Sequence, residues 1–201
     1  MKRAAIFVEG ETEMEFIVKL LKELANENRI NIFQHKVSGG GRNQPIRSAM
    51  LIGQHRASEA IFEFLVFNSW GDSRVASDMR DQAQSLAASG FGVILGLKDL
   101  RGEHGGRTLT IADLPNVVRA DRMVESMCSP IPTKLVTAVM EIETWFLAET
   151  SHYLCIDPSL DQRRVVAAYS MLGFNPFSDD LTLLPNPAEC LSRLYSLAQK
   201  G

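Results

Sequence analysis

The stretch Arg3-Ala-Ala-Ile-Phe-Val-Glu-Gly-Glu-Thr-Glu-Met-Glu-Phe16 joins a buried strand to a helix. Residues 4–8 are almost wholly apolar, which is typical of a strand covered on both faces in a parallel sheet. Thr12 and Glu15 have the spacing of a capping box, and apolar residues follow at helical spacing, so a helix is predicted to begin here. Glu9 therefore follows the strand directly, at the sheet edge where open α/β folds bind ligands.

Apolar runs alternate with helical periodicity through most of the chain. Strands are predicted near residues 30–37, 62–67, 91–97 and 134–139, and helices near 45–60, 75–90, 111–127 and 140–149. This alternation predicts an α/β fold with a mostly parallel sheet flanked by helices. After residue 151, prolines separate short helical pieces. We therefore expect an α/β domain over residues 1–150 and a small helical extension over residues 151–201 that packs on it.

The composition is that of an ordinary globular protein. The chain has 201 residues, a net charge of −3, 45% hydrophobic residues and 22% charged residues, which counts against disorder. The slight acidity argues against a broadly basic nucleic-acid-binding surface but leaves a local basic patch open. The three cysteines are widely spaced without a metal-binding pattern, and no apolar run has membrane-spanning length. Both features predict a reduced, cytoplasmic protein without a membrane partner.

Two predicted strands end in acids, at Glu9 and at Asp99. Because the carboxyl ends of parallel strands share one edge of a sheet, these carboxylates can approach each other if their strands are neighbours. Paired carboxylates suit Mg²⁺, which binds phosphates alongside one or two protein acids. In the structural alternative, acids after a strand serve the next helix. That interpretation fits Glu11, Glu13 and Glu15, which we assign to helix initiation.

Three segments together resemble a known family. The chain resembles the Toprim-like family known as domain-of-unknown-function family 4276. The segments that carry the resemblance are Val8-Glu9-Gly10-Glu-Thr-Glu13, Asp99-Leu-Arg-Gly102 and Met140-Glu-Ile-Glu-Thr-Trp-Phe-Leu-Ala-Glu149. That family looks related to the Toprim domains of topoisomerases, bacterial primases, small ribosomal-RNA maturases and OLD-type nucleases. The resemblance covers most of residues 3–150. It implies a compact, Rossmann-like Toprim fold in which a Glu after the first strand and a later Asp-x-Asp gather Mg²⁺ for phosphoryl transfer.

Glu9 matches the Glu of that pattern and Asp99 matches its first Asp, whereas Arg101 occupies the place of the second Asp. A guanidinium group donates hydrogen bonds and does not coordinate a cation, so Arg101 would instead hold a phosphate bidentately. This departure from the family pattern argues against a site with two metal ions.

The missing oxygen ligand could come from Glu103, or from Glu141 or Glu143 on the later helix. Since Glu141 and Glu143 point to different faces of a helix, only one of them can face the site easily. The resemblance favours Glu143, which lies just before Trp145. In the structural alternative, these acids form a salt bridge with Arg101 and hold the fold.

Four residues are the candidate substrate-binding residues: Gly10, Arg42, Asp72 and Arg101. The glycines before Arg42 would let the backbone approach a phosphate, although the Lys-Ser/Thr of a P-loop is missing and a flexible surface loop is the alternative. Asp72 follows a third strand and would line the same edge, or would form a turn. We interpret both tryptophans as packing residues, and no histidine shows metal-ligand spacing.

These patterns and the resemblance predict a Toprim-type phosphodiesterase that uses Mg²⁺, or Mn²⁺ in its place, to hydrolyse DNA or RNA. Glu9 would be a ligand or general base, Asp99 a ligand, Glu143 a supporting acid and Arg101 a phosphate clamp. OLD-type relatives pair a Toprim nuclease with an ABC-type ATPase, and the sequence contains no Walker motif. Such an ATPase would therefore be a separate partner protein. A role in defence against phage or plasmids follows by analogy.

Two other functions stay open at the level of the sequence. The first is a catalytically degenerate Toprim-like module that engages an ATPase or nucleic acid without cleavage, and Arg101 favours it. The second is a small nucleotide-binding α/β protein, which the lack of a glycine-rich fingerprint after any predicted strand counts against.

Overall fold

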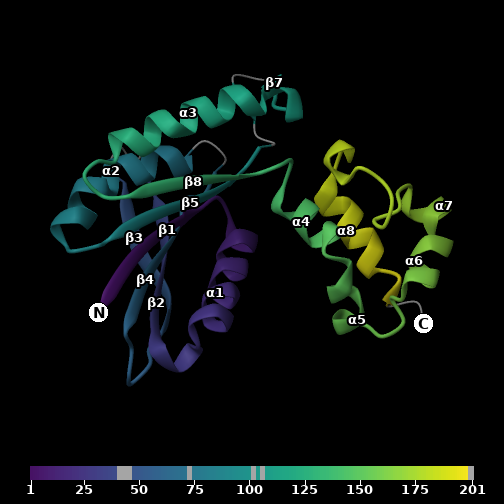
Figure 1. Cartoon of the computed structure of the whole chain (residues 1–201), viewed down its shortest axis with the longest axis horizontal. Coiled ribbons are helices and arrows are strands. Elements are labelled where there is room, and N and C mark those ends of the chain that lie inside the picture. Colours follow the sequence, from purple (N-terminus) through teal and green to yellow (C-terminus); the bar gives the residue numbers. More distant parts are fainter. Residues whose placement is uncertain (40–46, 72–73, 101–102, 105–106, 199–201) are drawn as a thin grey trace. The chain divides into compact units, whose positions relative to one another are not determined.

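The computed structural model describes residues 1–39, 47–71, 74–100, 103–104 and 107–198, in two compact units, Met1–Thr137 and Ala138–Gly201 (Figure 1). A six-stranded sheet with the strand order β3-β2-β4-β1-β5-β8 organises the first unit. Its strands are β1 (Lys2–Val8), β2 (Ile30–Ser38), β3 (Ser48–His55), β4 (Phe62–Asn68), β5 (Val93–Asp99) and β8 (Thr133–Ala138). A separate two-stranded sheet pairs β6 (Glu103–His104) with β7 (Arg107–Thr108).

Helices cover both faces of the six-stranded sheet. The helical elements of this unit are α1 (Glu11–Ala25), η1 (Glu27–Arg29), α2 (Arg74–Ala88), η2 (Ile111–Asp113) and α3 (Leu114–Met127). Helix α1 packs on β2 and β4, whereas α2 packs on β1, β5 and α3, and Figure 1 shows α1 on the opposite side of the sheet from α2 and α3. Strand β1 is parallel to both β4 and β5, and β2 is parallel to β4. The predicted α/β fold with a mostly parallel, Rossmann-like sheet is therefore confirmed.

The core between the sheet and α2 is built from apolar side chains of alternate strand positions. Phe7 and Phe67 stack with ring centroids 4.7 Å apart, and both pack with Val75 and Met79 of α2. Residues 5 and 7 of β1 belong to this cluster, as expected for a strand whose successive side chains alternate between faces. The apolar run of residues 4–8 is buried throughout, which confirms the interpretation of β1 as a strand covered on both faces.

The helix predicted over residues 45–60 is wrong, because its described residues contain β3. This strand pairs antiparallel with β2 at the edge of the sheet, with a register shift between Gln34 and His35. Gly53 lies opposite that shift, and a Cβ atom there would lie 3.0 Å from Nε2 of Gln34. Backbone hydrogen bonding to β2 therefore stabilises this segment as a strand despite its weak helical pattern, since the conformation of an edge strand depends on the strand that it pairs with.

The second unit consists of short helices. They are α4 (Ile142–Ala148), η3 (Thr150–His152), α5 (Tyr153–Ile156), α6 (Gln162–Ala167), α7 (Tyr169–Leu172), η4 (Leu181–Leu183) and α8 (Pro187–Tyr195). Its core includes Leu147, Tyr153 and Leu194, and the Tyr153 hydroxyl donates a hydrogen bond to the Leu147 carbonyl oxygen at 2.5 Å. Contacts with α8 place α4 in this unit, whereas the sequence had suggested that α4 ends the α/β domain.

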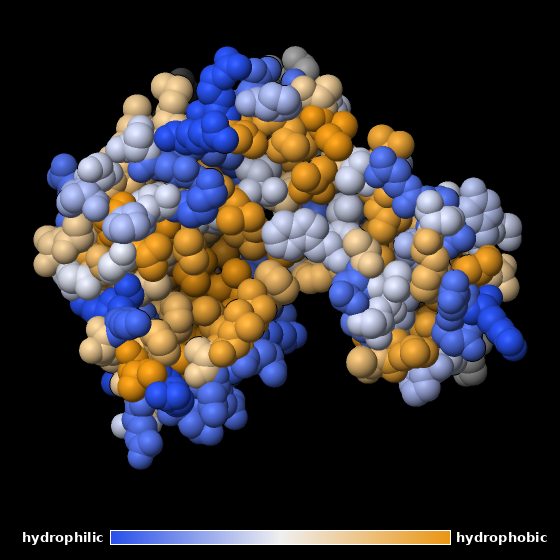
Figure 2. All heavy atoms as spheres, viewed as in Figure 1, coloured by the Kyte–Doolittle hydropathy of each residue, from blue (hydrophilic) through white to orange (hydrophobic). Residues whose placement is uncertain are grey.

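The surface carries both polar and apolar side chains, and Figure 2 shows orange hydrophobic areas among blue hydrophilic ones on the face in view. Exposed apolar residues include Met50, Leu51 and Ile52 of the edge strand β3. Within the described parts of the chain, no helix combines the length and the hydropathy that a membrane crossing requires.

Candidate functional site

The candidate site lies where the chain connections of the sheet change direction. From β1 the chain passes through α1 to β2 on one side, and from the neighbouring strand β4 it passes through α2 to β5 on the other. In open α/β sheets, the crevice at such a switch point is the usual position for a ligand. A pocket of about 370 Å³ occupies this position, and its lining residues are Glu9, Gly10, Glu11, Trp70 and Gly71.

The structure brings Glu9 and Asp99 together. Strands β1 and β5 pair in parallel with Val8 opposite Leu97, so both acids follow the same edge of the sheet. The Asp99 backbone N–H donates a hydrogen bond to Oε2 of Glu9 at 2.9 Å. This bond fixes the orientation of the Glu9 carboxylate at the pocket, and charge-assisted hydrogen bonds of this kind are stronger than neutral ones.

Gly10 is the N-cap residue of α1, so the capping box predicted from Thr12 and Glu15 is wrong. The helix begins at Glu11, one residue before Thr12, and no side chain caps it. A Cβ atom at Gly10 would lie 2.9 Å from Oε2 of Glu13, so the absence of a side chain here allows the Glu13 carboxylate to come close.

Glu13 lies in the first turn of α1, where an acid complements the helix dipole, in agreement with its assignment to helix initiation. It is only 6% exposed, and a buried carboxylate in the first turn of a helix is unusual. No sequence pattern separates Glu13 from the exposed acids Glu11 and Glu15.

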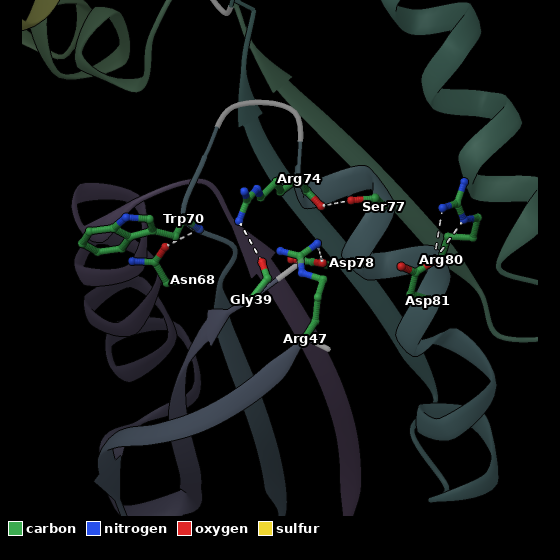
Figure 3. Close-up of polar contacts among 9 residues, drawn as sticks. All are labelled: Gly39, Arg47, Asn68, Trp70, Arg74, Ser77, Asp78, Arg80 and Asp81. Atoms are coloured by element: carbon green, nitrogen blue, oxygen red, sulfur yellow. Dashed lines mark hydrogen bonds and ion pairs between the residues drawn. The ribbon is translucent and has the colours of Figure 1, made fainter. Parts of the chain in front are cut away.

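Trp70 borders the pocket from the end of β4. Its side chain is 49% exposed, and its φ of 54° lies in the left-handed region, where residues other than glycine are uncommon. The Trp70 backbone N–H donates to Oδ1 of the fully buried Asn68 at 2.9 Å, as Figure 3 shows, and Lys36 Nζ lies 3.5 Å from the centroid of the indole ring. Trp70, interpreted from the sequence as a packing residue, is therefore about half exposed and lies beside a cation.

Two other polar residues near the sequence motifs have structural roles. Lys98 forms an ion pair with Asp121 of α3 at 2.6 Å, and the Thr137 hydroxyl donates to the same carboxylate at 2.9 Å. In the second unit, Oε2 of Glu141 accepts a hydrogen bond from the Ala188 backbone N–H at 3.2 Å in the first turn of α8. This bond satisfies one of the amide groups that a helix leaves unpaired at its start.

The remaining predicted site residues are placed elsewhere or are not described. Arg42, Asp72 and Arg101 lie outside the residues that the structure describes. Glu143 lies in the first turn of α4 and lines a cavity of about 390 Å³ in the second unit, together with residues of α8. Its role beside Glu9 stays a prediction. Over the described residues, no three His, Cys, Asp or Glu side chains are grouped so that they could hold a metal ion.

Comparison of the chain with protein-family models, with curated proteins and with solved structures finds no match.

Proposed function

We propose that the chain is a Toprim-type phosphodiesterase that hydrolyses nucleic acid with the help of Mg²⁺ or Mn²⁺. The observation that supports this proposal is the hydrogen bond from the Asp99 backbone N–H to the carboxylate of Glu9, a residue that lines the pocket at the sheet's switch point. Two carboxylates suffice for Mg²⁺, because this ion keeps several waters and takes further oxygen ligands from the phosphate of its substrate. The cluster is therefore compatible with Mg²⁺ even though no group of three ligands occurs among the described residues.

In this proposal, the chain's own residues bind and orient the phosphodiester. When bound, the metal would supply charge stabilisation at the phosphoryl oxygens. The hydrogen bond from the Asp99 N–H holds the Glu9 carboxylate in place, either as a ligand or as the base that takes a proton from water. The family pattern would add Glu143 as a supporting acid and Arg101 as a phosphate clamp. An ABC-type ATPase partner and a role in phage or plasmid defence belong to the same proposal.

Trp70 and Lys36 support nucleic acid as the substrate class. An exposed aromatic ring next to a lysine provides a face for base stacking and a charge for the phosphate backbone. The chain as a whole has a net charge of −3, so this contact would be local.

The second candidate is a Toprim-like module that binds nucleic acid or an ATPase without cleavage. Arg101 favours it, because a guanidinium group in the place of the second Asp donates hydrogen bonds and does not coordinate a cation. Both candidates share the Trp70 and Lys36 surface, so binding alone does not separate them.

A cleavage assay separates the two candidates. Purified protein is incubated with supercoiled plasmid, single-stranded DNA and RNA, with Mg²⁺, with Mn²⁺ and with EDTA. We expect metal-dependent cleavage that falls at least about 100-fold in Glu9→Gln and Asp99→Asn, because removing one charge-stabilising group costs about that much. Glu15→Gln is the matched control, since Glu15 is an exposed acid of α1, the helix that follows Glu9, and it should cut like the wild type.

The same assay identifies the second candidate. If the wild type binds nucleic acid but cuts no substrate with either metal, the non-cleaving module is supported and the enzymatic proposal is wrong. If cleavage occurs but is unchanged in Glu9→Gln and Asp99→Asn, the cleavage does not come from this site.

A further inference from the structure

A second cavity, of about 290 Å³, lies in the first unit between the start of β3 and α2. It shares no lining residue with the pocket at the switch point. Its charged and polar lining includes Arg47, which precedes β3, and Asp78, Asp81 and Gln82 of α2. Since one water molecule takes up about 30 Å³ in the liquid, the cavity has room for a ligand of several non-hydrogen atoms.

The centre of this cavity is a buried ion pair with unused hydrogen-bonding groups. Nη1 of Arg47 contacts Oδ1 of Asp78, a residue that is only 3% exposed, and Figure 3 shows the guanidinium group facing that carboxylate. Nε and Nη2 of Arg47 and Oδ2 of Asp78 are also buried, yet none of these three atoms has a hydrogen-bond partner among the described residues. Buried polar atoms in folded proteins are nearly always paired, so a partner is expected at this position.

The unpaired atoms define the chemistry of that partner. Nε–H and Nη2–H lie along one edge of the planar guanidinium group, and this edge matches two oxygens of a single oxyanion. Oδ2 of Asp78 is an acceptor. The Ser69 hydroxyl is close enough to lower the pKa of this carboxyl group, yet Ser69 Oγ and Asp78 Oδ2 both lack a hydrogen-bond partner among the described residues, so a donor from the ligand would pair with Oδ2. A carboxylate or a sulfate offers only acceptors at neutral pH. A phosphate that carries a proton offers both acceptors for Arg47 and a hydroxyl for Asp78.

The surrounding charges are compatible with a bound anion. Arg74, at the start of α2, donates to the Gly39 carbonyl oxygen at 3.4 Å and acts electrostatically on the Asp78 carboxyl group. The negative charge of Asp81 is offset by its ion pair with Arg80 at 3.2 Å, drawn at the right of Figure 3. Burial raises the pKa of Asp78, and the charge of Asp81 acts in the same direction, while the Ser69 hydroxyl, Arg47 and Arg74 act in the opposite direction.

We propose that this cavity binds a protonated phosphate, either inorganic phosphate or the phosphate group of a mononucleotide. Nε–H and Nη2–H of Arg47 donate hydrogen bonds to two of its oxygens, and Oδ2 of Asp78 accepts a hydrogen bond from its hydroxyl group. This site is independent of the phosphodiesterase proposed above, because it uses neither Glu9 nor Asp99.

The experiment measures binding to the full chain by isothermal titration calorimetry. Inorganic phosphate, AMP and sulfate are titrated in EDTA into the wild type and into Glu9→Gln, so that a metal site at Glu9 does not contribute. Arg47→Lys retains the positive charge but loses the planar edge. Asp78→Asn keeps one oxygen for the contact with Arg47 but puts an amide donor in place of the second acceptor. Arg56→Lys is the matched control, since Arg56 is an exposed arginine at the other end of β3. Circular dichroism checks that each variant is folded.

We expect phosphate or AMP to bind the wild type and Glu9→Gln equally, with sulfate at least about 10-fold weaker. The Arg47→Lys change should weaken phosphate binding at least about 10-fold, Asp78→Asn should remove the preference over sulfate, and Arg56→Lys should have no effect. Binding of phosphate without AMP identifies the free ion as the ligand, and binding of both identifies a monoester site. The inference is wrong if the wild type binds neither at millimolar concentration, if sulfate binds equally well, or if folded Arg47→Lys binds like the wild type.

Discussion

Replacement of Gly96 by alanine tests how closely α2 and β8 approach the strand that carries Asp99. Gly96 is in the middle of β5, and a Cβ atom there would lie under 3.0 Å from Cδ1 of Leu135 and from Sδ of Met79. Both neighbours are in the core, with Met79 fully buried and Leu135 only 4% exposed, so neither can move without displacing other side chains. Overpacking of a core by a methyl group typically costs about 1–3 kcal/mol.

The Cβ atom would meet two core atoms at once, so the cost of overpacking should lie at the upper end of that range, and we expect Gly96→Ala to lower the free energy of unfolding by about 2 kcal/mol net. Alanine regains part of the cost, roughly 0.5–1 kcal/mol, because glycine loses more conformational freedom on folding. Gly92→Ala is the matched control, since the nearest atom to a Cβ there is the Arg3 carbonyl oxygen at 3.8 Å, an ordinary contact. Its free energy of unfolding should stay within about 0.5 kcal/mol of the wild type.

Urea unfolding at equilibrium measures the difference. With a slope of about 2 kcal/mol per molar urea, the midpoint of Gly96→Ala should lie about 1 M below that of Gly92→Ala. Adding Leu135→Val to Gly96→Ala should restore part of the lost free energy of unfolding, because the effects of mutations at two residues in direct contact are not additive. A midpoint for Gly96→Ala equal to or above that of Gly92→Ala would refute the packing of β5 described here.

Three further perturbations test other parts of the structure. Burial lowers the pKa of His35 below 6.5, so the unfolded chain binds more protons in acid and the free energy of unfolding should fall as the pH drops below 6.5. His35→Gln should remove this pH dependence in urea titrations at about pH 5 and about pH 7.5. Tyr153→Phe removes the donor to the Leu147 carbonyl oxygen and should cost about 1–2 kcal/mol in thermal unfolding, whereas an unchanged midpoint would contradict the hydrogen bond. Lys98→Met leaves the buried carboxylate of Asp121 without its cation and should cost about 3 kcal/mol, and a loss below about 1 kcal/mol would show that the pair is dispensable.

The parallel part of the sheet could be predicted from the sequence because its strands are apolar on both faces. Residues 4–8 show this for β1, and the edge where Glu9 and Asp99 lie follows from strand direction alone. The edge strand β3 could not be predicted in the same way. Its residues Met50, Leu51 and Ile52 are all exposed, so the sequence of this strand does not alternate between apolar and polar residues. The strand depends instead on pairing with β2. Such pairing is not visible in a local pattern.

The acids of the first helical turn show a second limit. Glu11, Glu13 and Glu15 all suit the start of a helix, yet only Glu13 is buried. The helix begins at Glu11, with Gly10 as its N-cap, and sequence patterns locate such a boundary only to within about one or two residues, which is too coarse to say which of the three acids is buried. Likewise, the sequence could not predict that Nε and Nη2 of Arg47 are buried without a hydrogen-bond partner among the described residues, because the ion-pair partner Asp78 lies 31 positions away on another element.

Binding of Mn²⁺ at Glu9 and Asp99 tests the central claim most directly. Electron paramagnetic resonance measures free Mn²⁺ during titration of the wild type, Glu9→Gln, Asp99→Asn and the exposed control Glu15→Gln. We predict a bound ion in the wild type and in Glu15→Gln, and an affinity at least about 10-fold lower in both site variants, since each loses one charged ligand. No binding by the wild type, or equal binding by Glu9→Gln and the wild type, would contradict a metal site at the junction of β1 and α1.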